Sequence, residues 1–153
     1  MPAGWLAIVE RRLPFYARLP QPLRERFLGD LTVFASEKYF FGAGGLDLTD
    51  EHRVTIAGVA ARLIVHLDLS YYDRLTEIVV YPYDYTHPRK HSDEGATGPN
   101  IKVFGEAHNW GTVVLSWPAV LRGLANPCDG HDTATHEFAH VLDRASGAFN
   151  GTP

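Results

Sequence analysis

Cysteine is nearly absent from this sequence, since Cys128 is the only one among 153 residues. A single cysteine excludes an intrachain disulfide and a cluster of thiolate metal ligands. It suits a reducing compartment, so we expect a cytoplasmic protein. Long apolar runs are also missing: none approaches the roughly 18 residues of a membrane-spanning helix. The first twenty residues lack a charged region followed by a long apolar core, so we expect no signal peptide.

Concentrated positive charge is missing as well. The 14 Lys and Arg residues are scattered among 18 Asp and Glu residues, and the formal net charge is −4. A nucleic-acid-binding surface needs a concentrated basic face, so we expect no direct nucleic-acid partner. The share of hydrophobic residues, 45%, is typical of a globular protein. The length predicts a single domain over residues 1–153.

Four segments carry apolar residues at the three- and four-residue spacing of an α-helix. They are residues 22–40, 49–67, 119–126 and 132–145. Thr49 and Asp132 are the expected N-caps of the second and the last, because a short side-chain oxygen can accept a hydrogen bond from the first helical turn. The first twenty residues predict a further short helix followed by a loop.

Two segments are rich in β-branched and aromatic residues and are followed or closed by proline, residues 76–82 and 111–117. We therefore expect an α/β (α+β) fold with a small mixed sheet. The second strand is either an edge strand, along which an extended peptide could lie, or an interior strand. The glycine-rich residues 41–48 predict a turn between helices. A phosphate-binding loop is disfavoured there, because the Lys-Ser/Thr ending is missing and we expect no strand before it.

The segment TATHEFAHVLD, residues 133–143, contains the pattern HExxH. At about 100° per residue, His140 and Asp143 fall within about 40° of His136 on a helix. Glu137 lies at the border, about 100° away. The apolar residues occupy the other side of the helix: Ala134, Phe138, Ala139, Val141 and Leu142. The sequence thus predicts a helix with one face in the core and two histidines on the other.

This pattern is the one that zinc hydrolysis needs. Two imidazoles one turn apart can bind one Zn²⁺, since side chains four positions apart lie over the same turn. Glu137 can activate the zinc-bound water as a general base. Asp143, one turn beyond His140, could orient a ligand histidine through its second ring nitrogen. The alternative is an ordinary polar helix face with Asp143 in solvent or paired with Arg144.

Other polar residues are weaker candidates. Four histidines lie in expected loops, and of these His131 is nearest to the HExxH pattern as a substitute ligand. The other three are His87, His91 and His108. Three alternating tyrosines are more typical of core or rim aromatics than of catalytic groups: Tyr81, Tyr83 and Tyr85.

The motif HEFAHVLD, together with VVLSWPAVL, FGAGGLDLTDEHRVTIA and IVVYP, resembles the Mlc titration factor A family of zinc-dependent peptidases from about residue 13 onward. The resemblance implies a cytoplasmic protein with a zincin-type fold similar to the catalytic domain of anthrax lethal factor. It also implies an aminopeptidase-like activity on a peptide substrate. Some members bind the glucose-responsive transcriptional repressor Mlc and so relieve repression of sugar phosphotransferase genes.

The resemblance also assigns residues. His136 and His140 match the family's metal ligands for Zn²⁺, and Glu137 matches its catalytic glutamate. The third ligand in the family is a glutamate on a later helix, and no such position exists in this chain. We therefore expect a C-terminally shortened form that binds zinc weakly and has an incomplete site. Its uncovered face would favour self-association.

Two functions follow as alternatives. The first is a zinc metallopeptidase in which Glu137 acts in hydrolysis. The second is a non-catalytic regulatory protein that binds and sequesters an Mlc-like repressor. The motif favours the enzyme, because a protein that only binds a partner has no need of Glu137, while the missing ligand argues against activity of this chain by itself.

Overall fold

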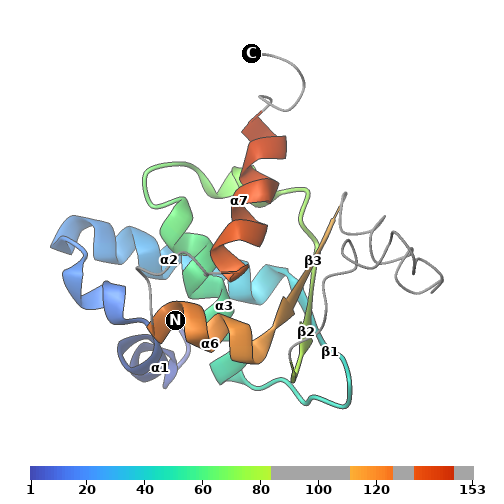
Figure 1. The fold of residues 1–153 in the computed structure, drawn as a ribbon. Coiled ribbons are helices and arrows are strands. Elements are labelled where there is room, and N and C mark those ends of the chain that lie inside the picture. Colours follow the sequence, from blue (N-terminus) through green and yellow to red (C-terminus); the bar gives the residue numbers. More distant parts are fainter. Residues whose placement is uncertain (84–110, 126–132, 147–153) are drawn as a thin grey trace.

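The fold combines helices with a small sheet (Figure 1). The computed structural model describes residues 1–83, 111–125 and 133–146, and the structural statements below concern these residues. The elements, in chain order, are α1 (Trp5–Arg12), η1 (Pro14–Arg18), α2 (Gln21–Glu37), β1 (Tyr39–Gly42), α3 (Asp50–Leu63), η2 (Leu69–Tyr72), β2 (Glu77–Tyr81), β3 (Thr112–Ser116), α6 (Trp117–Ala125) and α7 (Thr133–Ser146). The α/β fold class is therefore confirmed.

The sheet has three described strands in the order β1-β2-β3. All pair in parallel, with Tyr39 opposite Glu77 and Glu77 opposite Thr112. The expectation of a mixed sheet is thus not met by these strands. Parallel neighbours need a crossover between them, and α3 lies in the connection from β1 to β2.

Strand β1 is an element that the sequence did not predict, because the helical pattern was extended through residue 40. Instead α2 ends at Glu37, and Lys38 already has extended backbone angles. The aromatic residues that follow pair with β2, far along the chain. A strand therefore does precede the glycine-rich segment, which corrects one of the two reasons against a phosphate-binding loop. The missing Lys-Ser/Thr ending still stands against it.

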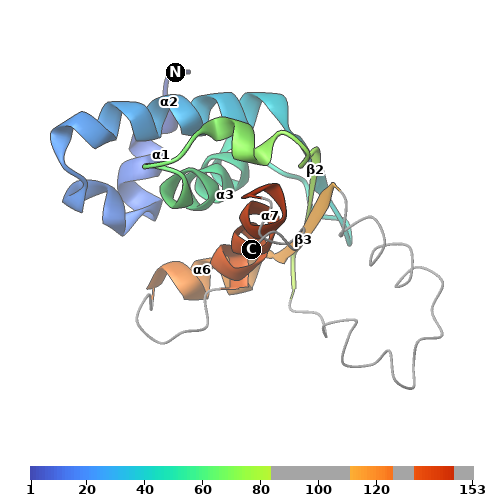
Figure 2. The ribbon, with the colours of Figure 1, turned by 90° about the horizontal axis from the view of Figure 1, so that it is seen from above.

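The described helices lie to one side of the sheet in both views (Figures 1 and 2). The sheet residues that face them belong to the main hydrophobic core: Ile78, Val80, Val113 and Leu115. Val79 and Val114 are also buried but lie outside that core. Because successive side chains of a strand alternate between faces, these two valines lie on the opposite face of the sheet.

Helix α3 is the central helix of the core and packs against α1, α2 and α7. Every residue from Val54 to Ala61 is buried. Its amino-terminal end is tied to α1, because Trp5 Nε1 donates a hydrogen bond to Asp50 Oδ2 at 3.1 Å. Arg12 pairs with Glu51 in the same turn.

The predicted N-cap of α3 is confirmed. The Thr49 side chain and the side chain of His52 form a reciprocal capping box at this helix end. The backbone N–H of Thr49 donates to His52 Nδ1 at 3.0 Å. A glutamate or glutamine usually takes this third position, and here an imidazole nitrogen serves as the acceptor.

The remaining predicted helices and strands are present with shifted ends. Helices α2, α3, α6 and α7 correspond to the four expected helices, and α1 with η1 to the short helix at the start. Asp132, the expected cap of α7, lies outside the described residues. Within the described part of the chain, no helix is long and apolar enough to cross a membrane.

Candidate metal centre

Helix α7 carries the HExxH residues, and its burial follows the predicted faces. Ala134 and Phe138 are fully buried. Val141 and Leu142 are partly buried and pack against the core. The polar residues of the opposite face are exposed: His136, His140 and Asp143. The helix thus has one side in the core and presents both histidines on the other.

Phe138 anchors this helix in an aromatic cluster with Phe34 of α2 and Tyr72 of η2. The Phe138 ring lies edge-on to both, with ring centroids 5.9 Å from each. Phe34 and Tyr72 lie edge-on to each other at 5.3 Å. Such pairs contribute about 0.5–1.5 kcal/mol each beyond the area that they bury. The cluster therefore sets the rotation of α7 about its axis, and with it the direction of the histidine face.

Tyr72 is itself held in place by hydrogen bonds at its hydroxyl and at its backbone oxygen. Its hydroxyl donates a hydrogen bond to the backbone oxygen of Ala60, at 2.9 Å, in the middle of the core. Its backbone oxygen accepts from Lys38 Nζ at 2.7 Å. Burial raises the pKa of the Tyr72 hydroxyl far above its usual value, so this donor keeps its proton at all physiological pH values. The aromatic cluster consequently connects α7 to α3 through a hydrogen bond as well as through packing.

Glu137 lies at the border between the two faces, as its helical angle predicts. It is 8% exposed, although it is charged and follows an exposed histidine. A carboxylate at this position is shielded from bulk water on the core side and lies next to His136 in the chain. It is therefore suited to act on a molecule held at the histidine face rather than to serve as a solvent-exposed ligand.

The donor set of α7 fits part of a zinc site. Two imidazoles four positions apart are suitable zinc ligands, and both are accessible. Within residues 1–83, 111–125 and 133–146, no group of three or more His, Cys, Asp or Glu side chains is arranged to hold a metal ion. Since catalytic zinc usually has three protein ligands, the two histidines of α7 are fewer than such a site needs, and these described residues hold no third candidate beside them.

The weaker candidates fall into two groups. Tyr81 is half-buried and Tyr83 is exposed, and their rings lie 5.8 Å apart at the end of β2. Burial, together with Tyr83, raises the pKa of Tyr81, so its hydroxyl is protonated at neutral pH. The other candidates lie outside the described residues: Tyr85, His87, His91, His108 and His131.

Strand β3 leads directly into α6, and both elements pack against α7. All five residues of β3 are buried. The strand is last in the described order β1-β2-β3, which favours the edge-strand alternative within this sheet. That a peptide lies along it remains a prediction.

The chain is similar to known proteins over its whole length. The whole chain, residues 1–153, matches the family described as glucose-regulated metallo-peptidase M90. The chain belongs to this metallopeptidase family. Its exposed histidine pair on α7 is therefore found in a family whose description names a metal-dependent peptidase.

Individual relatives agree with this assignment. An uncharacterised protein of Synechocystis sp. is 35% identical over 156 residues, covering 100% of this chain and 57% of that protein. Mlc titration factor A of Klebsiella pneumoniae (strain 342) is 28% identical over 138 residues, covering 88% of this chain and 51% of that protein. Mlc titration factor A of Edwardsiella ictaluri is 28% identical over 145 residues. The resemblance to Mlc titration factor A proteins is thus confirmed.

The chain spans about half the length of the curated relatives that it matches. It covers 57% of the Synechocystis protein, 51% of the Klebsiella protein and 54% of the Edwardsiella protein. In proteins of that length, a metal site could take ligands from the half that matches this chain and from the other half. The two histidines of α7 are in the half that corresponds to this chain.

Proposed function

We propose that this chain carries the histidine pair and the catalytic glutamate of a zinc metallopeptidase with aminopeptidase-like activity. The observation that supports this proposal is the exposed face of α7. It presents His136 and His140 beside the mostly buried Glu137, on a helix held by Phe138. Zinc, when bound, supplies a Lewis acid that polarises the peptide carbonyl and lowers the pKa of a coordinated water.

The residues of the chain have separate roles in this proposal. His136 and His140 hold the metal as neutral imidazoles. Glu137 accepts a proton from the attacking water and donates it to the leaving amine, so that the carboxylate is regenerated at the end of each cycle. Asp143 accepts a hydrogen bond from the second ring nitrogen of a ligand histidine and fixes its tautomer.

The test is the substitution Glu137→Gln in the full-length protein. We expect peptidase turnover on a short peptide to fall at least about 100-fold, because the base is removed. Zinc content, measured by elemental analysis, stays at the wild-type level because no ligand is lost. Glu25→Gln, at an exposed position on α2, is the matched control and should retain full activity.

Two results would contradict the assignment. Loss of zinc in Glu137→Gln would make Glu137 a ligand rather than a base. Unchanged turnover with zinc retained would remove Glu137 from the reaction altogether.

A second function is favoured by the printed name of several relatives, Mlc titration factor A. In this alternative the chain binds an Mlc-like transcriptional repressor without cleaving it. The same variant distinguishes the two functions. Glu137→Gln would leave repressor binding, measured by surface plasmon resonance, at the wild-type level if binding is independent of catalysis.

A further inference from the structure

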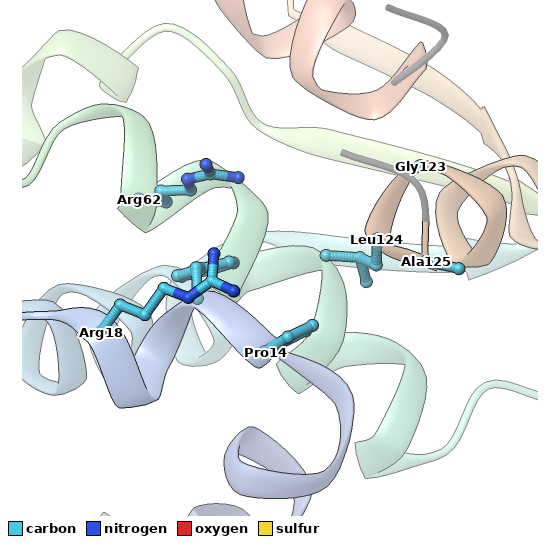
Figure 3. Close-up of a pocket in the computed structure, with 7 residues that line it drawn as sticks. Pro14, Arg18, Arg62, Gly123, Leu124 and Ala125 are labelled. Carbon is cyan, nitrogen blue, oxygen red and sulfur yellow. The ribbon is translucent and has the colours of Figure 1, made fainter. Parts of the chain in front are cut away.

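A pocket lies where η1, the end of α3 and the end of α6 meet. Its volume is about 230 Å³. The residues that line it are Pro14, Phe15, Arg18, Arg62, Gly123, Leu124 and Ala125. Figure 3 shows the two arginine side chains on one side of the pocket, with Leu124 and Ala125 on the other. None of these residues belongs to the candidate metal centre.

The two arginines of this pocket differ from most other described arginines, because neither has an acidic partner. Arg11 and Arg12 pair with Glu51, and other ion pairs join Arg26 to Asp30 and Arg53 to Asp50. Within the residues that the structure describes, the side chains of Arg18 and Arg62 make no ion pair and no hydrogen bond. Their guanidinium donors are therefore available to a ligand.

Arg62 is nevertheless held in position. Its guanidinium carbon lies 4.6 Å from the centroid of the Phe15 ring. Phe15 is fixed in turn by an edge-on contact with the fully buried Phe27, at 5.6 Å. A guanidinium stacked on a ring keeps its planar row of N–H donors free, and little conformational entropy is lost when it binds an oxyanion.

The charge at the pocket favours an anion. Arg18 and Arg62 contribute two positive charges. The carboxyl-terminal ends of α3 and α6 oppose them with about half a negative charge each, from the dipole of each helix. A net charge of about +1 remains. Among the described residues, no acidic side chain forms an ion pair with either arginine, so this part of the chain leaves the charge available to an anion.

Much of the remaining lining of the pocket is apolar, so that the pocket favours a ligand with an organic part as well as a charge. Pro14 and Leu124 contribute carbon surface, and Leu124 is nearly buried. A simple hydrated anion would gain nothing from this apolar lining, whereas an organic group attached to the anion would bury surface against it.

We propose that this pocket binds a small organic oxyanion, a carboxylate or a phosphate monoester. Its charged group is held by Arg18 and Arg62, and its organic part packs against Pro14 and Leu124. The planar donors of arginine match both kinds of oxyanion through paired hydrogen bonds. The site is separate from the metal centre and does not depend on the peptidase assignment.

The test is isothermal titration of the 153-residue chain with phenyl phosphate and with benzoate. The two probes share an aromatic part and differ in the oxyanion, so they show whether the pocket prefers a phosphate monoester or a carboxylate. We expect one-to-one binding of at least one probe. Arg18→Gln and Arg62→Gln should each weaken it by about tenfold or more, because a charged hydrogen-bonding group is lost. Both side chains are exposed, so folding, checked by circular dichroism, should be retained.

Arg74→Gln is the matched control, since Arg74 is exposed and lies outside the pocket. It should leave the affinity for the probe unchanged. If Arg74→Gln weakened binding as much as Arg18→Gln or Arg62→Gln, the probe would be attracted by the overall charge and not by this pocket, and the proposal would be wrong. Failure of both probes to bind would also overturn it. Inorganic phosphate should bind more weakly than phenyl phosphate, and equal affinity would overturn the role of the apolar lining.

Discussion

At the scale of single residues, three consecutive positions of α7 have three different environments. His136 is exposed, Glu137 is 8% exposed and Phe138 is 0% exposed. A helix turns by about 100° per residue, so consecutive side chains point into solvent, along the border and into the core. This arrangement would allow one short motif to contain the proposed metal ligand, the proposed base and the residue that anchors the helix. Substitutions at neighbouring positions should therefore have unrelated effects.

His52 is a second residue whose environment determines its chemistry. Its ring lies tilted against that of Trp117, with centroids 4.5 Å apart, and its Nδ1 accepts a hydrogen bond from the N–H of Thr49. Burial lowers the pKa of His52 below its ordinary value of 6.5. Glu51 opposes this shift, and the positive charge of Arg12 adds to it. Because the unfolded chain then binds a proton more readily than the folded chain, stability decreases as the pH falls below about 6.5.

We predict that His52→Gln removes this part of the pH dependence. Glutamine keeps a side-chain acceptor for the Thr49 N–H but does not titrate. Above pH 7 the difference in unfolding free energy between wild type and variant should be constant. Between about pH 6.5 and pH 5 it should shift in favour of the variant. Urea unfolding across this range measures it, and a difference that does not vary with pH would refute the prediction.

At the scale of elements, α7 depends on contacts supplied by distant segments. It packs against α3, η2, β3 and α6, and the Phe138 ring is the part that reaches deepest. A 14-residue helix of modest propensity is marginal by itself, so its stability comes from this buried face. The direction of the histidines is thus set by packing and not by the helix alone.

We predict that Phe138→Ala destabilises the protein by about 3–5 kcal/mol, because it removes a fully buried ring and leaves a cavity between Phe34 and Tyr72. Val141→Ala, on the same helix at a partly buried position, should cost less than half of that. Denaturant unfolding of both variants gives the two values. Similar costs would mean that the aromatic cluster does not anchor α7.

Two helical glycines allow a matched test of packing. A Cβ on Gly58 of α3 would lie 2.3 Å from Leu13 Cδ1, whereas a Cβ on Gly29 of α2 meets nothing within 4 Å. Leu13 is buried and cannot easily move. We predict that Gly58→Ala costs about 1–3 kcal/mol through overpacking. Gly29→Ala should instead stabilise by up to about 1 kcal/mol, because alanine is the better helix former. Changes of the same sign in both variants would contradict this.

At the scale of the whole molecule, one hydrophobic core connects the first helix to the last. Its buried members extend from Trp5 of α1 to Phe138 of α7. We propose on this basis that residues 1–153 form one folding unit. The histidine face of α7 lies at the surface of this unit, and the described residues form no group of three possible metal ligands there, so the proposed site would need a ligand from elsewhere.

We predict that the 153-residue chain by itself binds Zn²⁺ weakly. The proposal gives the metal two imidazole ligands, and a catalytic zinc site usually has three protein ligands. Titration of the metal-free chain with Zn²⁺ measures the affinity, and His136→Ala should abolish what remains. Tight one-to-one binding, accompanied by activity on a short peptide, would show that a third ligand is present within the chain.

The sequence by itself identified the metallopeptidase family and predicted the local structure of the HExxH segment. The HExxH spacing predicts which side chains of α7 share a face, because helical geometry is local and repeats with a fixed period. The observed burial of Ala134 and Phe138 and the exposure of His136 and His140 agree with that prediction. The Thr49 cap was predictable for the same reason, since a cap involves residues only three positions apart.

Only the tertiary structure decided the features that join distant segments. Strand β1 exists because Tyr39–Gly42 pair with β2. The local sequence pattern instead predicts that the preceding helix continues through residue 40. The Phe34–Tyr72–Phe138 cluster and the pocket of Arg18 and Arg62 unite residues that no local spacing relates. Such contacts depend on how distant segments pack together in the core. The periodicity of the sequence describes only local structure, so it does not predict them.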